Sequence, residues 1–220
     1  MIIKTRGIVL SYIKYRDTSI IVKVYTEDHG MHSFIVNNIR SARSKKSMGL
    51  YQSFNLLEMV TYWKESMTIH RLSDAKLVVP LHNIHQNIRK TTIALFLSEF
   101  LQRVLVHEQL ENQQLFRFLY NSVLKLEEME SYIENFHLQF LLKLAPYLGF
   151  GFKSVEFLNL MDEKEEDQTR RLLLENFGYE VAMNSEGRSR LLKMLLRFYQ
   201  NHIENLPDIK SLKVLQQIFH

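Results

Sequence analysis

The fold of this chain is decided by residues 1–37, MIIKTRGIVLSYIKYRDTSIIVKVYTEDHGMHSFIVN. Side-chain types alternate along residues 2–14, which predicts a β-strand. The β-branched run SIIVKVYT (19–26) predicts a second strand. The acidic, glycine-ended stretch EDHG (27–30) predicts a hairpin turn, so MHSFIVN (31–37) follows as a third strand.

Two more strands are predicted after a loop at residues 38–49. They are FNLLEMVTYW (54–63) and TIHRL (68–72), with a short polar turn between them. Five short strands within about 75 residues favour a small closed sheet. The sequence therefore predicts a five-stranded β-barrel of the OB type.

The pattern changes to a helical period after Pro80. Apolar residues recur at helical spacing along residues 88–105, 115–126 and 133–148. We expect Pro146 to shorten the third of these helices and Gly149 to end it. An acidic run at 162–167 opens a further predicted helix, and a final pair is predicted at about 188–204 and 208–219.

The predicted fold class is therefore α+β, with an OB barrel followed by an all-helical domain. We place an OB-fold nucleic-acid-binding domain at residues 1–80 and a helical partner-binding domain at residues 81–220.

Composition excludes several classes of protein. The 220 residues include no cysteine, which excludes disulfides, thiol nucleophiles and cysteine-ligated zinc. The N-terminus lacks the apolar region of a signal peptide, and no apolar run is long enough to cross a membrane. We therefore expect a cytoplasmic protein, without a membrane partner and associated with the nucleoid if it binds DNA.

The positive charge is concentrated at the N-terminal end. Residues 1–80 carry 12 Lys and Arg against 6 Asp and Glu, a net charge of +6, whereas the whole chain carries +4. A localised basic domain is typical of proteins that bind polyanions. A solvated basic surface with no partner is the alternative interpretation.

No catalytic motif is present. The sequence contains no GxxxxGK[ST] loop, no GxGxxG after a strand and no GxSxG elbow, so we expect neither an enzyme nor a cofactor. Two histidine pairs, His29 with His32 and His82 with His85, are spaced three apart. Neither pair has an evident third ligand, so we predict no metal site and interpret these residues as exposed loop histidines. A metal-dependent hydrolase that uses His82 and His85 is the remaining enzymatic alternative.

The candidate nucleic-acid site is the loop NNIRSARSKKS (37–47) with its neighbouring strands. Cations along a phosphate backbone, with bases stacked on aromatic rings, form the usual single-strand platform. We interpret Tyr25 and Phe34 as core residues and Tyr15, beside Arg16, as the exposed aromatic candidate. The predicted DNA-binding residues are Lys4, Arg6, Lys14, Tyr15, Arg16, Arg40, Arg43, Lys45, Lys46 and Arg71.

Several segments resemble the RecO family of bacterial recombination mediators. The likeness is carried by KTRGIVLSYIKYRDTSIIVKVYTEDHG (4–30), IRSARSKKS (39–47), IRKTTIALFLSEFLQRVL (88–105), FHLQFLLKLAPYLGF (136–150) and SLKVLQQIF (211–219). The resemblance implies an OB barrel and a helical domain, and it gives Arg6, Arg40, Arg43, Lys45 and Lys46 a DNA-contacting role.

The same resemblance implies a set of activities and partners. These are binding of single- and double-stranded DNA, annealing of complementary strands without ATP, contact with RecR and with the acidic tail of the single-stranded DNA-binding protein SSB, and help in loading RecA. Arg89, Lys90, Arg103 and Arg117 are the predicted rim of a partner-binding groove. Many family members carry a cysteine zinc module in the helical domain, which this cysteine-free chain is predicted to lack. A protein-interaction module with an incidental basic loop is the alternative function.

Overall fold

The computed structural model of this protein describes residues 1–41, 47–151 and 162–219. Contacts divide the chain into two compact units. One consists of Met1–Leu81 and Ser98–Tyr120, and the other of His82–Leu97 and Asn121–His220.

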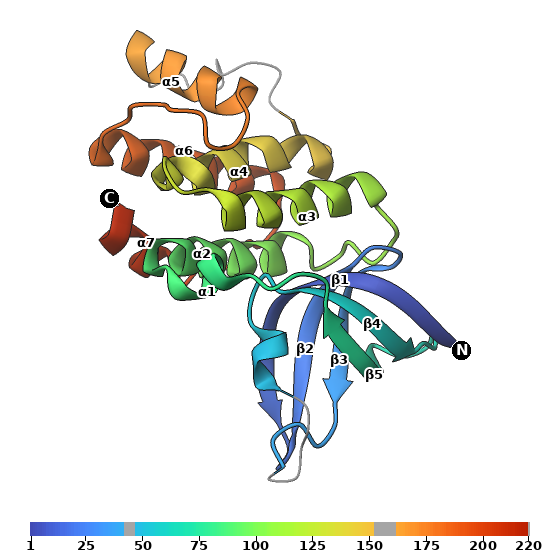
Figure 1. Cartoon of the computed structure of the whole chain (residues 1–220). Helices are drawn as coiled ribbons and strands as arrows, with labels where there is room; N and C mark the ends of the chain where they lie inside the picture. The colour runs from blue at the N-terminus through green and yellow to red at the C-terminus, as the bar shows by residue number, and fades with distance from the viewer. Residues whose placement is uncertain (42–46, 152–161, 220) are drawn as a thin grey trace. The chain divides into compact units, whose positions relative to one another are not determined.

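The first unit contains a closed five-stranded barrel with strand order β1-β2-β3-β5-β4 (Figure 1). This order confirms the predicted barrel and its place at the N-terminal end of the chain. The strands are β1 (Ile2–Tyr15), β2 (Ser19–Thr26), β3 (Gly30–Val36), β4 (Leu56–Tyr62) and β5 (Ile69–Leu77), and a 3₁₀ turn, η1 (Met48–Tyr51), precedes β4.

Strand β1 is long because it pairs with two neighbouring strands. Residues Ile2–Ile8 pair with β4, and residues Gly7–Tyr15 pair with β2 across a bulge between Val9 and Ser11. Gly7 belongs to both ladders, and a Cβ atom there would lie 2.4 Å from Cγ1 of Val24. Glycine at this position therefore lets one strand close the barrel on both sides.

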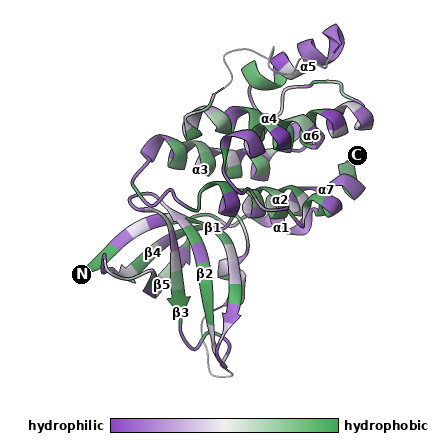
Figure 2. Ribbon diagram, turned by 180° about the vertical axis from the view of Figure 1, so that it is seen from behind, coloured by the Kyte–Doolittle hydropathy of each residue, from purple (hydrophilic) through white to green (hydrophobic). Residues whose placement is uncertain are grey.

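Inward-facing aliphatic and aromatic side chains fill the barrel. Val22, Val24, Phe34, Leu57 and Leu72 belong to this core. Hydrophobic and hydrophilic residues alternate along the strands, as the colouring in Figure 2 shows. Tyr25 and Phe34 are fully buried, which confirms their interpretation as core residues.

The segment Ser98–Tyr120 groups with the barrel because it contacts the strands directly. The amide of Met31 donates to the carbonyl of Glu108 at 2.7 Å, and the ring of Tyr25 stacks on Phe116. Gly30 has a positive φ of 69°, and a Cβ there would lie 2.2 Å from the Glu108 carbonyl oxygen. The turn before β3 therefore requires glycine.

Seven α-helices lie in the described part of the chain, and most of their length belongs to the second unit. The fourth ends at Leu144 and continues as a 3₁₀ turn that contains Pro146, with Gly149 left-handed behind it at φ 85°, as predicted. The helices are α1 (His82–Gln86), α2 (Ile88–Val104), α3 (Gln113–Glu128), α4 (Phe136–Leu144), α5 (Glu163–Leu174), α6 (Ser185–His202) and α7 (Leu212–Phe219).

The acidic run at 162–167 begins a helix, as predicted. The Asp162 side chain accepts a hydrogen bond from the Glu165 amide at 2.8 Å and caps α5, whose first turn carries three glutamates. No helix among the described residues is long and apolar enough to cross a membrane.

Candidate nucleic-acid interface

The turn between β1 and β2 and the segment after β3 meet at one end of the barrel (Figure 1). The Arg40 amide donates to the Thr18 carbonyl at 2.9 Å, and the Arg40 guanidinium donates to the Arg16 carbonyl at 3.2 Å. The hydroxyl of Thr18 also donates to the side chain of Asn38. These bonds bring Arg16 and Arg40 together although they lie 24 residues apart.

Four of the predicted residues share this barrel end, which we call the basic tip and define as Lys14, Tyr15, Arg16 and Arg40. The Arg16 guanidinium lies 5.1 Å from the centre of the Tyr15 ring. Lys14, Arg16 and Arg40 are exposed, and Asp17 is the acidic residue of the same turn. The half-buried ring of Tyr15 and three exposed cations therefore lie at one place. Arg43, Lys45 and Lys46 lie outside the described residues.

Arg71 connects to the basic tip through a row of outward-facing side chains, the cross-barrel row. Strand pairing aligns Ile13 with Ile21, Ile21 with Ile35, Ile35 with Arg71, and Arg71 with Tyr62. Ile13 is 62% exposed and Tyr62 is 46% exposed. The Arg71 guanidinium lies 5.6 Å from the centre of the Tyr62 ring. The row therefore begins beside Lys14 and ends in a stacked arginine–tyrosine pair.

Lys4 and Arg6 lie on a different face of the barrel. They line a depression of about 400 Å³ together with the acidic residues Glu27, Asp28, Glu58 and Asp74. Two nitrogens of Arg6 bind the two carboxylate oxygens of Glu27 at 2.7 and 2.6 Å. This pairing raises the pKa of Arg6 and lowers the pKa of Glu27. The guanidinium of Arg6 is thus already bound within the protein.

Comparison with models of known protein families shows which family the chain belongs to. The model "Recombination protein O N terminal" matches residues 1–81, and "Recombination protein O C terminal" matches residues 85–155. This chain belongs to the recombination protein O (RecO) family.

Similar proteins cover the chain from end to end. The chain is 34% identical to the DNA repair protein RecO of Bacteroides fragilis and 33% identical to that of Phocaeicola vulgatus, with all of both chains covered in each case. The DNA repair protein RecO of Flavobacterium psychrophilum is 31% identical over the same full coverage.

The four predicted partner-binding residues of this RecO family member are divided between the two compact units. Lys90 is 2% exposed and its ammonium donates to the Glu127 carbonyl at 2.7 Å, so it has almost no surface to present to a partner. Arg89 pairs with Glu134 at 3.0 Å. Arg103 and the exposed Arg117 belong to the barrel unit instead.

Three histidines and a tryptophan form a ring stack that the sequence reasoning missed. His29 and His70 stack on either side of Trp63 at 4.0 and 3.9 Å, and His32 meets Trp63 and His70 edge-on. The interpretation of His29 and His32 as exposed loop histidines is wrong, because both side chains are half-buried and His32 lies within β3. Their neighbour His70 is fully buried. Period-two alternation in β5 offered one signal, because it places His70 on the same inward face as Leu72.

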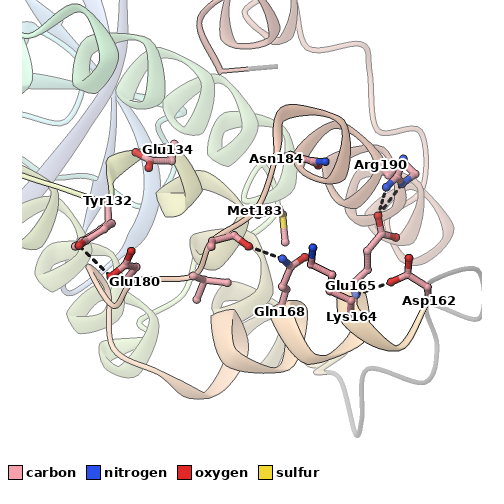
Figure 3. A pocket seen from close by; sticks show the side chains of 12 residues that line it. Tyr132, Glu134, Asp162, Lys164, Glu165, Gln168, Glu180, Met183, Asn184 and Arg190 are labelled. Carbon is pink, nitrogen blue, oxygen red and sulfur yellow. Dashed lines mark hydrogen bonds and ion pairs between the residues drawn. The ribbon is translucent and has the colours of Figure 1, made fainter.

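The helical unit contains a polar depression of about 450 Å³ (Figure 3). Its charged groups bind one another: Arg190 pairs with Glu165, and the Tyr132 hydroxyl donates to Glu180 at 3.0 Å. Gln168 donates to the Ala182 carbonyl. Several of the polar side chains that line the depression are therefore already bound within the protein.

The grouping of histidine and acidic side chains among the described residues bears on a possible metal site. Among these residues, no three His, Asp or Glu side chains are grouped so that they could hold a metal ion. The His82 and His85 pair of the hydrolase alternative therefore lacks a described third ligand.

Proposed function

We propose that this RecO family member binds DNA through the barrel and anneals complementary strands without ATP, as a non-enzymatic step of DNA repair. The observation that carries the proposal is the convergence of Lys14, Tyr15, Arg16 and Arg40 at the basic tip, continued by the cross-barrel row to Arg71.

Each kind of side chain on this surface matches a chemical group of single-stranded DNA. Arg16, Arg40 and Lys14 would neutralise phosphates and release their counterions. The ring of the half-buried Tyr15 and that of the exposed Tyr62 would stack on unpaired bases, and the isoleucines between them would cover the apolar edges of further bases. Reduced repulsion between two bound strands is sufficient to speed their pairing, and no covalent step is needed.

The helical unit is the proposed site of protein partners. It exposes apolar side chains on two helices, with Ile88 and Leu95 on α2 and Val214 and Ile218 on α7. The Arg89 guanidinium, 5.3 Å from the Phe219 ring centre, adds a cation near these residues. An apolar surface with a cationic neighbour suits the acidic tail of SSB, a helix-surface mode of binding. Contact with RecR and help in loading RecA complete the proposal.

An annealing assay tests this function. Two complementary labelled oligonucleotides are mixed without ATP, and the rate of pairing is followed by fluorescence. We expect the wild-type chain to accelerate pairing and added salt to suppress the effect, because the contacts are mainly electrostatic. Pairing at the protein-free rate would refute the annealing activity.

The alternative is a protein-interaction module, and the aliphatic character of Ile13, Ile21 and Ile35 is the observation in its favour. A protein partner buries such side chains as readily as a base does. Under this alternative, Ile21→Ser would abolish capture of RecR and leave oligonucleotide affinity unchanged. Under the DNA-binding proposal, the same substitution weakens oligonucleotide binding.

A further inference from the structure

One of the strand pairings that close the barrel, the β3–β5 ladder, is short. Strands β3 and β5 are joined by three residue pairs, Ser33 with Ile69, Phe34 with His70 and Ile35 with Arg71. The ladders between β1 and β4 and between β2 and β3 have seven pairs each. The short ladder is also parallel, a pairing that is slightly weaker per residue than antiparallel pairing. Fewer and weaker backbone pairings therefore join β3 to β5 than join the strands of those two antiparallel ladders.

His70 occupies the middle position of this ladder. Its side chain is fully buried, and neither ring nitrogen has a hydrogen-bond partner among the described residues. The Nε2 atom of His32, on the neighbouring β3, is also buried without a described partner. A buried imidazole without partners costs free energy even when neutral, and a charged one costs far more.

The groups around His70 make a positive charge still less favourable. His32 faces it from β3, with ring centres 5.2 Å apart, and His29 reaches the same stack from the turn between β2 and β3. Trp63 and Phe34 supply the remaining ring contacts. Glu108, the carboxylate on the segment bonded to β3, acts on Tyr25 instead. The charges acting on His70 are therefore those of two other histidines, which repel a third proton.

We propose that acidification opens the barrel at the β3–β5 ladder, with His70 as the group whose protonation releases it. The inference goes beyond the proposed function and does not depend on DNA binding. Opening would separate Ile35 from Arg71 and so interrupt the cross-barrel row.

The direction of the effect follows from proton linkage. Burial, followed by the neighbouring histidines, lowers the pKa of His70 below its ordinary value of 6.5, and burial also lowers the pKa of His32. An opened ladder exposes both rings, so the open state binds protons at a higher pH than the closed state does. Stability of the ladder is fully present above pH 6.5 and is lost as the pH falls from there through the lowered pKa values.

Hydrogen exchange followed by mass spectrometry tests this inference on the full chain. Exchange of the β3 and β5 peptides is compared with exchange of β1 and β2 peptides in the same sample, which corrects for the pH dependence of intrinsic exchange. We expect β3 and β5 to lose up to about tenfold in relative protection between pH 7.5 and 5.5, because an exposed histidine of ordinary pKa 6.5 is about tenfold more often charged than neutral at pH 5.5.

Two variants separate His70 from general acid sensitivity. His70→Phe keeps a ring against Trp63 but cannot be protonated, so it should lose most of the pH response. His82→Phe, the same change at an exposed position, should respond like the wild type. Equal relative protection at both pH values, or a full response in His70→Phe, would overturn the proposal. If His70→Phe does not fold, His70→Leu takes its place, and a full pH response in that variant overturns the proposal equally.

Discussion

Arg6 is a basic residue that the sequence predicts to bind DNA, but in the folded protein its side chain is bound to another residue. Its guanidinium binds Glu27 through two hydrogen bonds and lies over the rings of Tyr120 and Phe116, 5.2 and 5.7 Å from their centres. The ion pair is partly solvated, because the Arg6 side chain is 43% exposed. Its contribution to stability is therefore smaller than that of a buried pair.

We predict that Arg6→Lys destabilises the protein by about 1 kcal/mol, because lysine keeps the charge but loses the paired geometry and the stacking. Urea unfolding measures the change. Lys4→Arg, at an exposed position on the same face, is the control and should stay within about 0.5 kcal/mol of the wild type. A large loss of DNA affinity in Arg6→Lys, without loss of stability, would contradict this structural role and show that Arg6 contacts DNA.

Substitution of Tyr15 distinguishes the contribution of base stacking from that of charge attraction at the basic tip. We predict that Tyr15→Ala weakens binding of a labelled single strand by about 1 kcal/mol or more, since one stacked base is lost. The slope of log affinity against log salt should not change, because no phosphate contact is removed. Tyr179→Ala, an exposed tyrosine of the helical unit, should leave both quantities unchanged. A reduced slope in Tyr15→Ala would show that the ring acts through Arg16.

Local sequence could not distinguish Arg6 from Arg16. The partner of Arg6 lies 21 residues away, and the register that pairs Gly7 with Thr26 brings the two side chains together. Arg16 lies in the turn itself, so its exposure follows from local sequence alone. Charge density therefore predicted a basic domain, whereas strand register decided which cations remain available.

At the level of elements, α7 is held by its last described residue. Phe219 is 4% exposed and its ring contacts His137, while its carbonyl accepts a hydrogen bond from Arg188 at 2.9 Å. The Arg89 guanidinium lies over the same ring, 5.3 Å from its centre. Phe219, together with the buried Leu215, thus anchors a short helix that would be marginal alone.

We predict that Phe219→Ala destabilises the helical unit by about 3 kcal/mol, because it removes a buried aromatic ring and leaves a cavity. Val214→Ala, at an exposed position of the same helix, is the matched control and should cost less than about 0.5 kcal/mol. Thermal unfolding followed by circular dichroism measures both. Similar losses in the two variants would show that α7 is not docked through Phe219.

Periodicity predicted most elements but not every boundary. Strand β5 was expected to end at Leu72 and instead continues to Leu77. The added residues SDAKL have little β-propensity of their own, and pairing with β4, for example of Leu57 with Leu77, holds them extended. In contrast, Pro146 and Gly149 act locally, so the end of α4 could be predicted correctly.

At the scale of the whole molecule, the position of the available positive charge decides where DNA would bind. The first 80 residues carry a net +6. Among the cations that the structure describes, three lie at the basic tip, whereas Lys4, Arg6 and Lys76 lie on a face whose acidic residues offset them. A family relationship along the full chain agrees with a role in DNA repair. The central claim is that the basic tip is the part of the barrel that holds DNA.

Fluorescence anisotropy with a labelled single strand, at several salt concentrations, tests this claim most directly. The variant Arg16→Gln/Arg40→Gln removes two cations of the basic tip, and Lys193→Gln/Lys213→Gln removes two exposed cations of the helical unit. We predict that the first variant binds about tenfold more weakly, with a salt slope about 1.4 units shallower, and that the second matches the wild type. Unchanged affinity and slope in the first variant would contradict the account.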